Sequence, residues 1–326
     1  MRHINVGLLG MGNIGTGTYK TLEMNKECIA RNTGLDITIS RILEKDVLRE
    51  RDVTVDMSQF TQNPDDVLND PSIGIVIELL GGIEPATSFM LAALRNGKHV
   101  VTANKAAVAK NYSQLMKTAR DNGVMIRFEA AVGGGIPILN ALTSQLLSNK
   151  CMEILGILNG TTNYILTQMA QNGLAYEDAL KDAQAKGFAE ADPTADVEGH
   201  DVANKLSILI SMSFGERIPP EDIPTVGITG ISMADIEKAS AEGKKIKLIA
   251  QAKRKEGGGV ECSVGPMAIP ADSPLAGVNN EFNAIYIVGN AVGELMFYGK
   301  GAGPLPTGSA VMGDVIEIGL TSAMFR

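Results

Sequence analysis

The sequence predicts an α/β fold, with a parallel sheet in the first domain and an α+β arrangement in the second. Strand and helix signals alternate over the first 130 residues, which is the pattern of a parallel sheet with helical crossovers. From about residue 133 this alternation ends, and several strand-like runs follow one another between residues 246 and 299. A length of 326 residues also suits two domains, since domains usually have about 100–200 residues.

Short apolar and β-branched runs predict the strands of the first domain. The run at 73–80, IGIVIELL, is continuously apolar, as in a strand that is buried on both faces of a parallel sheet. The expected strands are 3–9, 35–43, 73–80, 99–103 and 124–128. The helices expected between them are 14–30, a brief one opened by residues 63–66, 85–96 and 111–122.

The second domain is expected to begin with helices and to continue with strands. Its expected helices are 136–147, 162–171, 176–186 and 201–214, with a strand at 151–158. The glycine-rich stretch 256–259 predicts a turn between two of the later strands. Residues 301–326 predict a turn and a helix that return to the first domain, because their apolar side chains would otherwise be uncovered. The expected domains are therefore 1–130 together with 301–326, and 131–300.

Composition and charge exclude several classes of partner. The net charge of −8 argues against nucleic acid and against an anionic membrane surface, because both repel an acidic protein. Three scattered cysteines form neither a metal cluster nor a disulfide framework, and they indicate reduced thiols. No apolar run approaches the roughly 20 residues of a membrane span, and Met1 leads almost directly into a strand, without a signal peptide. We expect a cytoplasmic protein.

A glycine-rich motif lies between the first strand and the first helix. It reads Gly10-Met-Gly12-Asn13-Ile14-Gly15. In a Rossmann-type domain the first glycine forms the tight turn, the second lets the backbone approach a pyrophosphate, and the third lets the helix pack on the strand. A turn without a ligand is the alternative, but the strand–turn–helix context favours a dinucleotide site.

The end of the second strand should contain the residue that recognises the ribose 2′ position of the dinucleotide. The sequence there is Glu44-Lys45-Asp46, followed by Arg49 and Arg51. An acid would accept a hydrogen bond from the 2′-hydroxyl of NAD, whereas Lys45 or an arginine would neutralise the 2′-phosphate of NADP. A solvated loop fits nearly as well. The choice between NAD and NADP stays open, with a slight preference for NADP.

Polar residues also follow the strand at 99–103. Thr102 and Lys105 lie at its carboxyl end, where open parallel sheets bind ligands. Both are candidates for contact with the cofactor, and Lys105 can face cofactor and substrate together. A surface lysine at the start of a helix is an equally good interpretation of Lys105.

The segment 187–205 combines acidic residues with an apolar helix. Five carboxylates lie within the twelve residues 190–201, among them Glu190, Asp196 and Asp201. Asp201 and Lys205 are four residues apart on one helical face, which is the spacing of an ordinary surface ion pair. The alternative is a general-acid lysine that Asp201 orients. This role requires partial burial and a nearby cation such as Lys105 to bring the pKa of Lys205 below the usual value of about 10.4. The two interpretations have equal weight.

A third polar feature is Glu129 followed by the glycines 133–135. These glycines form either a plain flexible turn or a place where carbonyl oxygens converge on a cation or ligand. A transition-metal site is not expected, because the chain has only three histidines and no paired His or His/Cys spacing.

Eight ordered motifs resemble those of the homoserine dehydrogenase family over essentially the whole chain. The most specific is GFAEADPTADVEGHDVANKL at 187–206. The others are GLLGMGNIGTG (7–17), ELLGG (78–82), HVVTANKA (99–106), EAAVGGGIPI (129–138), GILNGTTNYIL (156–166), PTVGITGIS (224–232) and GKGAGPLPTGSAV (299–311). The resemblance implies an NAD(P)-dependent enzyme of threonine and methionine biosynthesis that interconverts L-aspartate 4-semialdehyde and L-homoserine.

By position in these motifs, the resemblance implies roles for individual residues. Lys205 matches the proton donor, Lys105 the lysine between nicotinamide and substrate, and Asp201 the acid near the reacting oxygen. Glu190 and Asp196 match substrate-binding carboxylates. The positions whose main-chain oxygens hold a sodium ion in the family are Glu129, Val132, Gly134 and Ile136.

The resemblance also bears on the tail, the assembly and regulation. Gly301 and Gly303 match glycines that return to the cofactor, and family members form homodimers through the sheet of the second domain. Many members have an additional C-terminal regulatory domain, whereas this sequence stops at Arg326. Threonine inhibition through such a domain is therefore not expected.

Two alternative functions share the nucleotide motif. One is another amino-acid semialdehyde dehydrogenase, although the acylating kind needs a nucleophilic cysteine, and no cysteine here lies in such a motif. The other is a non-enzymatic redox sensor that binds a dinucleotide. Such a sensor would not need Lys105, Asp201 or Lys205.

Overall fold

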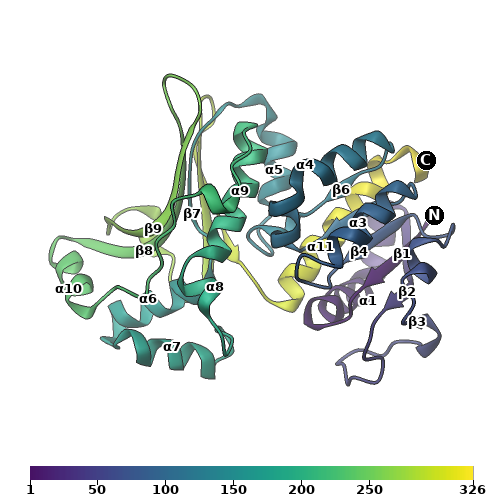
Figure 1. Cartoon of the computed structure of the whole chain (residues 1–326), viewed down its shortest axis with the longest axis horizontal. Coiled ribbons are helices and arrows are strands. Elements are labelled where there is room, and N and C mark those ends of the chain that lie inside the picture. The colour runs from purple at the N-terminus through teal and green to yellow at the C-terminus, as the bar shows by residue number, and fades with distance from the viewer. Residues whose placement is uncertain (326) are drawn as a thin grey trace. The chain divides into compact units, whose positions relative to one another are not determined.

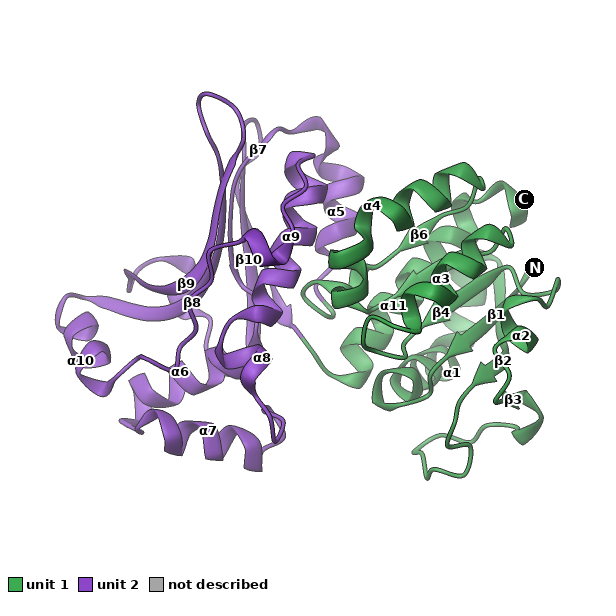
Figure 2. Cartoon of the chain, viewed as in Figure 1, with its two compact units in different colours: residues 1–135, 302–326 green, residues 136–301 purple. Residues whose placement is uncertain are grey.

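The structure, a computed structural model, describes residues 1–325 and divides into two compact units. Unit 1 contains Met1–Gly135 and Ala302–Arg326, and unit 2 contains Ile136–Gly301 (Figure 2). None of the helices in the described part of the chain has both the length and the apolar character needed to cross a bilayer.

Unit 1 contains a six-stranded sheet in the order β3-β2-β1-β4-β5-β6, and every pair of neighbours is parallel. This arrangement confirms the predicted Rossmann-type fold. The strands are β1 (Arg2–Leu9), β2 (Leu35–Leu43), β3 (Phe60–Thr61), β4 (Ile75–Glu78), β5 (His99–Thr102) and β6 (Ile126–Arg127). Apolar side chains of β1 such as Ile4, Val6 and Leu8 are fully buried, which explains why the central strands have continuous apolar sequences.

The α-helices of unit 1 connect these strands, apart from the C-terminal helix, which packs on the first one. They are α1 (Asn13–Thr33), α2 (Asp65–Leu68), α3 (Ala86–Arg95), α4 (Lys105–Asp121) and α11 (Pro304–Thr321). Figure 1 shows α11, in yellow, beside α1. The two helices approach closely because glycines lie at the crossing: a Cβ on Gly17 would lie 2.3 Å from Pro304 O, and one on Gly308 2.7 Å from Gly17 O.

Unit 2 is built on a five-stranded antiparallel sheet in the order β11-β10-β7-β8-β9. This confirms the α+β arrangement predicted for the second half. The strands are β7 (Cys151–Ile157), β8 (Lys244–Arg254), β9 (Val260–Pro270), β10 (Phe282–Gly289) and β11 (Gly293–Lys300). The turn predicted at 256–259 joins β8 to β9, where Lys255 N donates to Gly259 O.

The α-helices of unit 2 differ in places from the prediction. They are α5 (Ile138–Thr143), α6 (Gly160–Asn172), α7 (Tyr176–Ala185), α8 (Thr194–Val197), α9 (His200–Phe214) and α10 (Met233–Ala241). The helix predicted at 136–147 is wrong in extent, because Ser144 leaves helical geometry (φ −129°, ψ −84°) and separates α5 from a 3₁₀ turn at Gln145–Ser148. The sequence analysis missed α10, which begins with a capping box between Ser232 and Asp235.

In unit 1 the helix predicted at 111–122 begins six residues earlier, at Lys105. Asn111 (φ −112°, ψ 19°) forms a kink in α4, and its side chain donates to Thr87 Oγ1 and to Ala107 O. The expected helix begins only at this kink, so the sequence analysis missed residues 105–110, which precede the kink. Lys105 therefore starts the helix directly after β5.

Candidate functional site

The glycine motif forms the turn from β1 into α1. Gly10 has φ +93°, and a Cβ there would lie 2.9 Å from Leu79 O, so the residue must be glycine. A Cβ on Gly15 would lie 2.2 Å from Gly10 O. In contrast, a Cβ on Gly12 would meet no atom within 4 Å, which leaves open space beside the first turn of α1. Together with the N-terminus of a 21-residue helix, this cradle fits a pyrophosphate.

The residues after β2 pack against this turn. Glu44 accepts hydrogen bonds from Met11 N (2.9 Å) and Asp46 N (3.1 Å), and the largely buried Arg51 lies 3.5 Å from its carboxylate. Arg51 Nε also donates to Met11 O. The carboxylate of Glu44 therefore stabilises the loop and joins it to the glycine turn.

Two basic residues in this loop remain exposed. The Arg49 guanidinium donates to Asn13 Oδ1 (3.1 Å), which places a cation beside the glycine turn. The Lys45 side chain is exposed, and its main-chain oxygen accepts from Gln62. Sequence analysis selected Lys45 from this group, whereas the geometry gives Arg49 the closer relationship to the turn.

A buried polar network links the ends of β4 and β5. Glu78, which is fully buried, accepts from Thr102 Oγ1 (2.7 Å) and from Leu80 N (2.8 Å). Burial raises the pKa of Glu78, and the hydrogen bond from Thr102 is the largest effect opposing that rise. The network holds the loop that follows β4 at the same edge of the sheet as the glycine turn, since Leu79 O lies against Gly10.

The same network fixes the start of α4, where Lys105 is the first residue. Thr102 Oγ1 accepts from Asn104 N, and Asn104 Oδ1 caps the helix by accepting from Ala107 N (3.1 Å). Asn104 Nδ2 donates to Gly82 O in the loop after β4. Lys105 is therefore held at the carboxyl edge of the parallel sheet, the same edge as the glycine turn.

In unit 2 the predicted pair on α9 is buried. Lys205 Nζ lies 2.7 Å from Asp201 Oδ2 and donates to Leu158 O (2.6 Å) at the end of β7. Asp196, in α8, joins this cluster because Asn159 Nδ2 donates both to Asp196 Oδ1 (2.7 Å) and to Asp201 Oδ2 (2.9 Å). Of the two interpretations of Asp201 and Lys205, the surface ion pair is therefore wrong, because both side chains are buried, and the general-acid role of Lys205 stays a prediction.

Glu190 lies in the loop before α8, and its side chain is exposed. Its main-chain oxygen accepts from Gln184 Nε2 (3.0 Å). The side chain is thus accessible to a ligand from solvent, in contrast to the buried carboxylate of Asp201.

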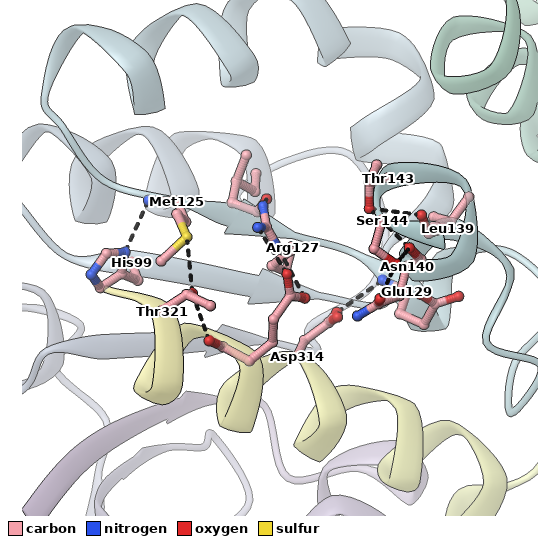
Figure 3. A network of polar contacts seen from close by, with 12 residues as sticks. His99, Met125, Arg127, Glu129, Leu139, Asn140, Thr143, Ser144, Asp314 and Thr321 are labelled. Carbon is pink, nitrogen blue, oxygen red and sulfur yellow. Dashed lines mark hydrogen bonds and ion pairs between the residues drawn. The ribbon is translucent and has the colours of Figure 1, made fainter. Parts of the chain in front are cut away.

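The residues selected as cation ligands lie around the 3₁₀ turn Glu129–Ala131. Glu129 is buried, and its N–H donates to Asp314 Oδ2 (2.9 Å) of α11, as Figure 3 shows. Burial raises the pKa of Asp314 well above its usual range. Gly133 (φ +74°) and Gly134 (φ +56°) turn the backbone after Val132. Ile136, the fourth selected residue, is the first residue of unit 2.

The two C-terminal glycines have different surroundings. A Cβ on Gly301 would lie 2.0 Å from Asn283 Nδ2, so only glycine fits against that side chain. Gly303 has φ +119° and forms the N-cap of α11. Sequence analysis missed Asn159, Asn104 and Glu78. The signal for Asn159 was available, because an asparagine directly before the helical sequence GTTNYIL is a typical N-cap.

Comparisons with known proteins match the whole chain to one family. The family model described as "Homoserine dehydrogenase, NAD binding domain" matches residues 10–129, and the model "Homoserine dehydrogenase" matches residues 137–316. Homoserine dehydrogenase of Bacillus subtilis is 44% identical over 318 residues, which cover 98% of this chain and 73% of the relative. The enzyme of Pseudomonas aeruginosa is 42% identical over the same shares of both chains.

Solved structures show the same relationship. A homoserine dehydrogenase from Thiobacillus denitrificans superposes with a TM-score of 0.92 at 43% identity, covering 98% of this chain and 74% of that one. A hyperthermophilic archaeal homoserine dehydrogenase in complex with NADPH has a TM-score of 0.81 at 27% identity. The match covers 99% of this chain and 100% of the archaeal chain.

Proposed function

The chain belongs to the homoserine dehydrogenase family of oxidoreductases, and on this basis we propose that it interconverts L-aspartate 4-semialdehyde and L-homoserine with Lys205 as the proton donor. The observation that carries this role is the buried hydrogen bond of 2.7 Å between Lys205 Nζ and Asp201 Oδ2. A buried lysine oriented by a carboxylate is suited to transfer a proton, whereas an exposed lysine would be mobile and fully hydrated.

A bound nicotinamide dinucleotide supplies or accepts the hydride at the substrate carbon. In the direction of reduction, negative charge builds on the aldehyde oxygen, and the Lys205 ammonium stabilises this charge and donates the proton. Asp201 Oδ2 and Leu158 O accept hydrogen bonds from the ammonium and fix its direction. Lys105 is the second cation of the proposed reaction centre, and the Asn104 cap at the start of α4 supports this role.

Glu190 and Asp196 are the proposed carboxylates for the α-ammonium group of the amino-acid substrate. The exposure of Glu190 and the hydrogen bond that holds Asp196 next to Asp201 support these roles. An ammonium group between carboxylates is bound by charge-assisted hydrogen bonds, which are stronger than neutral ones.

The cofactor is a nicotinamide dinucleotide, and we propose a preference for NADP. Arg49 beside Asn13 and the exposed Lys45 provide positive charge near the expected 2′ position, while Arg51 pairs with Glu44 and offsets its charge. The proposed backbone contacts come from Gly10, Gly12, Asn13, Ile14 and Gly15, with further contacts from Thr102, Lys105, Gly301 and Gly303. The NADPH complex of the archaeal relative supports a dinucleotide of this type.

A sodium ion is the proposed partner of the main-chain oxygens of Glu129, Val132, Gly134 and Ile136. The left-handed backbone at Gly133 and Gly134 turns the chain between the proposed ligands, and hard cations take oxygen ligands. The proposal predicts that sodium raises the thermal unfolding temperature at constant ionic strength, whereas a quaternary ammonium salt does not.

We further propose a homodimer through the sheet of unit 2, in a cytoplasmic enzyme. The exposed apolar side chains of this sheet, which include Met152, Met296 and Tyr298, support an interface there. Sedimentation at several concentrations tests the dimer.

The experiment that tests the proposed function follows the reduction of NAD⁺ and NADP⁺, separately, by absorbance. We expect purified protein with L-homoserine at alkaline pH to reduce at least one of the two cofactors. The rate should be higher with NADP⁺ than with NAD⁺. A protein that binds NADPH but reduces neither cofactor with homoserine would overturn the proposed reaction.

A further inference from the structure

We propose that Asn159 is a positioning residue that holds the carboxylates of Asp196 and Asp201 side by side and thereby fixes both the substrate-binding and the proton-donating groups. This inference rests on the proposed function for the roles of the two acids. The bridge itself is a property of the fold of unit 2.

Asn159 occupies the point where three helices of unit 2 begin or end. It is buried, it precedes α6 directly, and its amide nitrogen reaches α8 at Asp196 and α9 at Asp201. Asp201 Oδ2 accepts at the same time from Lys205 Nζ, so one oxygen atom joins Asn159 to the proposed proton donor. The side chain therefore connects Asp196 to Asp201 through two hydrogen bonds, and the bond from Lys205 to Asp201 extends this path to the proposed general acid.

The chemistry of the amide matches this position. Two carboxylates within reach of one nitrogen atom repel each other, and burial strengthens that repulsion. The NH₂ group carries two hydrogens and donates one to each acid. Its oxygen accepts from Thr162 N (2.9 Å) and from Thr162 Oγ1 (3.0 Å). Among the short side chains, only asparagine combines two donors with an acceptor in this way.

Helix capping alone does not account for these contacts. Serine and aspartate cap helices about as well as asparagine, and neither has an NH₂ group. A residue that served only α6 would use its oxygen, whereas Asn159 also uses both amide hydrogens on acids from two other helices. These two donor bonds separate a positioning role from a structural one.

Two variants keep the cap and change the donors. In Asn159→Asp the oxygen that caps α6 remains, but the NH₂ group is replaced by a negative oxygen between two acids. We expect kcat/KM for homoserine to fall about 100-fold, as displaced reacting groups typically cause, while the Kd of NADPH stays within about twofold. In Asn159→Ser the hydroxyl caps the helix and can donate only once, and the expected loss is about 10-fold, with a higher KM as well as a lower kcat.

A matched control removes another cap of the same unit. Ser232→Ala abolishes the capping box of α10 and is expected to lower thermal stability without a change in kcat/KM. The proposal is overturned if Asn159→Asp is folded and retains the wild-type kcat/KM, or if both Asn159 variants lose only stability, as the control does.

A double-mutant cycle tests the bridge without depending on turnover. If Asn159 acts through Asp196, then Asn159→Ser lowers the midpoint of urea unfolding less in an Asp196→Asn background than in the wild type. Additive shifts would overturn the bridge. Inactivity of the wild-type enzyme with homoserine would instead overturn the proposed function, and the unfolding cycle would still decide whether the bridge exists.

Discussion

Lys205 Nζ lies 2.7 Å from Oδ2 of Asp201, one turn earlier on α9, and both side chains are buried. An exposed pair with this spacing contributes about 0.3–0.5 kcal/mol to stability. Burial of such a pair gives little net gain, because desolvation of the two charges offsets their attraction. The burial of this pair is therefore better explained by the proposed role in proton transfer than by a contribution to stability.

Replacement of Asp201 tests this interpretation. Asp201→Asn keeps the shape of the side chain but removes the negative charge that orients the ammonium, so kcat is expected to fall at least about 10-fold with unchanged affinity for NADPH. The matched control is Asp121→Asn, which removes an exposed pair of the same spacing with Lys117 on α4 and should leave kcat unchanged. Equal kcat values for both variants and the wild type would remove Asp201 from the mechanism.

Replacement of Glu190 tests the proposed binding of the substrate ammonium group. Because its exposed carboxylate is proposed to bind the substrate ammonium, Glu190→Ala should raise KM for L-homoserine about 10-fold with little change in kcat. Steady-state rates over a range of homoserine concentrations separate the two constants. Glu177→Ala removes another exposed acid, on α7, and serves as the control. An unchanged KM in Glu190→Ala would exclude the proposed contact.

Arg49 tests cofactor preference. Its guanidinium lies next to Asn13 in the nucleotide turn, so Arg49→Ala should weaken the binding of NADP about 10-fold and that of NAD hardly at all. Titration of both cofactors, monitored by fluorescence of the reduced form, measures the two affinities. Arg31→Ala, at the end of α1, is an exposed control that should affect neither. Equal weakening of both cofactors would show that Arg49 does not bind the 2′-phosphate.

The lowered pKa of Lys247 predicts that the stability of the fold depends on pH. This buried lysine donates to Asn163 Oδ1 (2.9 Å) and to Val278 O (2.5 Å), and burial, followed by the charge of Lys245, lowers its pKa to about 8 from 10.5. Between these values the unfolded chain binds more protons than the folded protein, so stability should rise with pH.

The measurement for Lys247 is a comparison with Lys247→Met. The free energy of unfolding of the wild type should increase relative to the variant by about 3 kcal/mol between pH 7.5 and 10.5, as measured by urea denaturation. The variant cancels contributions from other titrating groups. A constant difference over this range would contradict the lowered pKa.

Five of the six strands of the parallel sheet could be predicted because each leaves a local pattern, whereas β3, with two residues, was missed. Leu35–Leu43, for example, is predicted and observed with the same limits. Irregular backbone was harder to predict. Asn111 interrupts α4 and donates to Ala107 O in the same helix and to Thr87 Oγ1 on α3, a contact that the local sequence does not contain. Ser144 ends α5 although the apolar pattern continues. The capping box at Ser232 and Asp235 was visible in the sequence and would have located α10.

For the candidate site, spacing brought Asp201 and Lys205 together but could not decide whether they are buried. That depends on how β7 and α9 pack, which places Leu158 O beside Lys205 Nζ. The capping role of Asn159 was visible in the sequence, but its contacts with acids were not, since Asp196 and Asp201 lie 37 and 42 residues away. Tertiary contacts of this kind leave no periodicity in a single sequence.

The turnover of Lys205→Ala with L-homoserine and NADP⁺, at saturating concentrations of both, tests the central claim most directly. Lys181→Ala, on the surface of α7, is the control for loss of a lysine. If Lys205 is the proton donor of the reduction, it accepts the hydroxyl proton of homoserine in this direction, so kcat falls at least about 100-fold in the variant while the Kd of NADPH is unchanged. A Lys205→Ala enzyme with near-normal kcat would contradict the account.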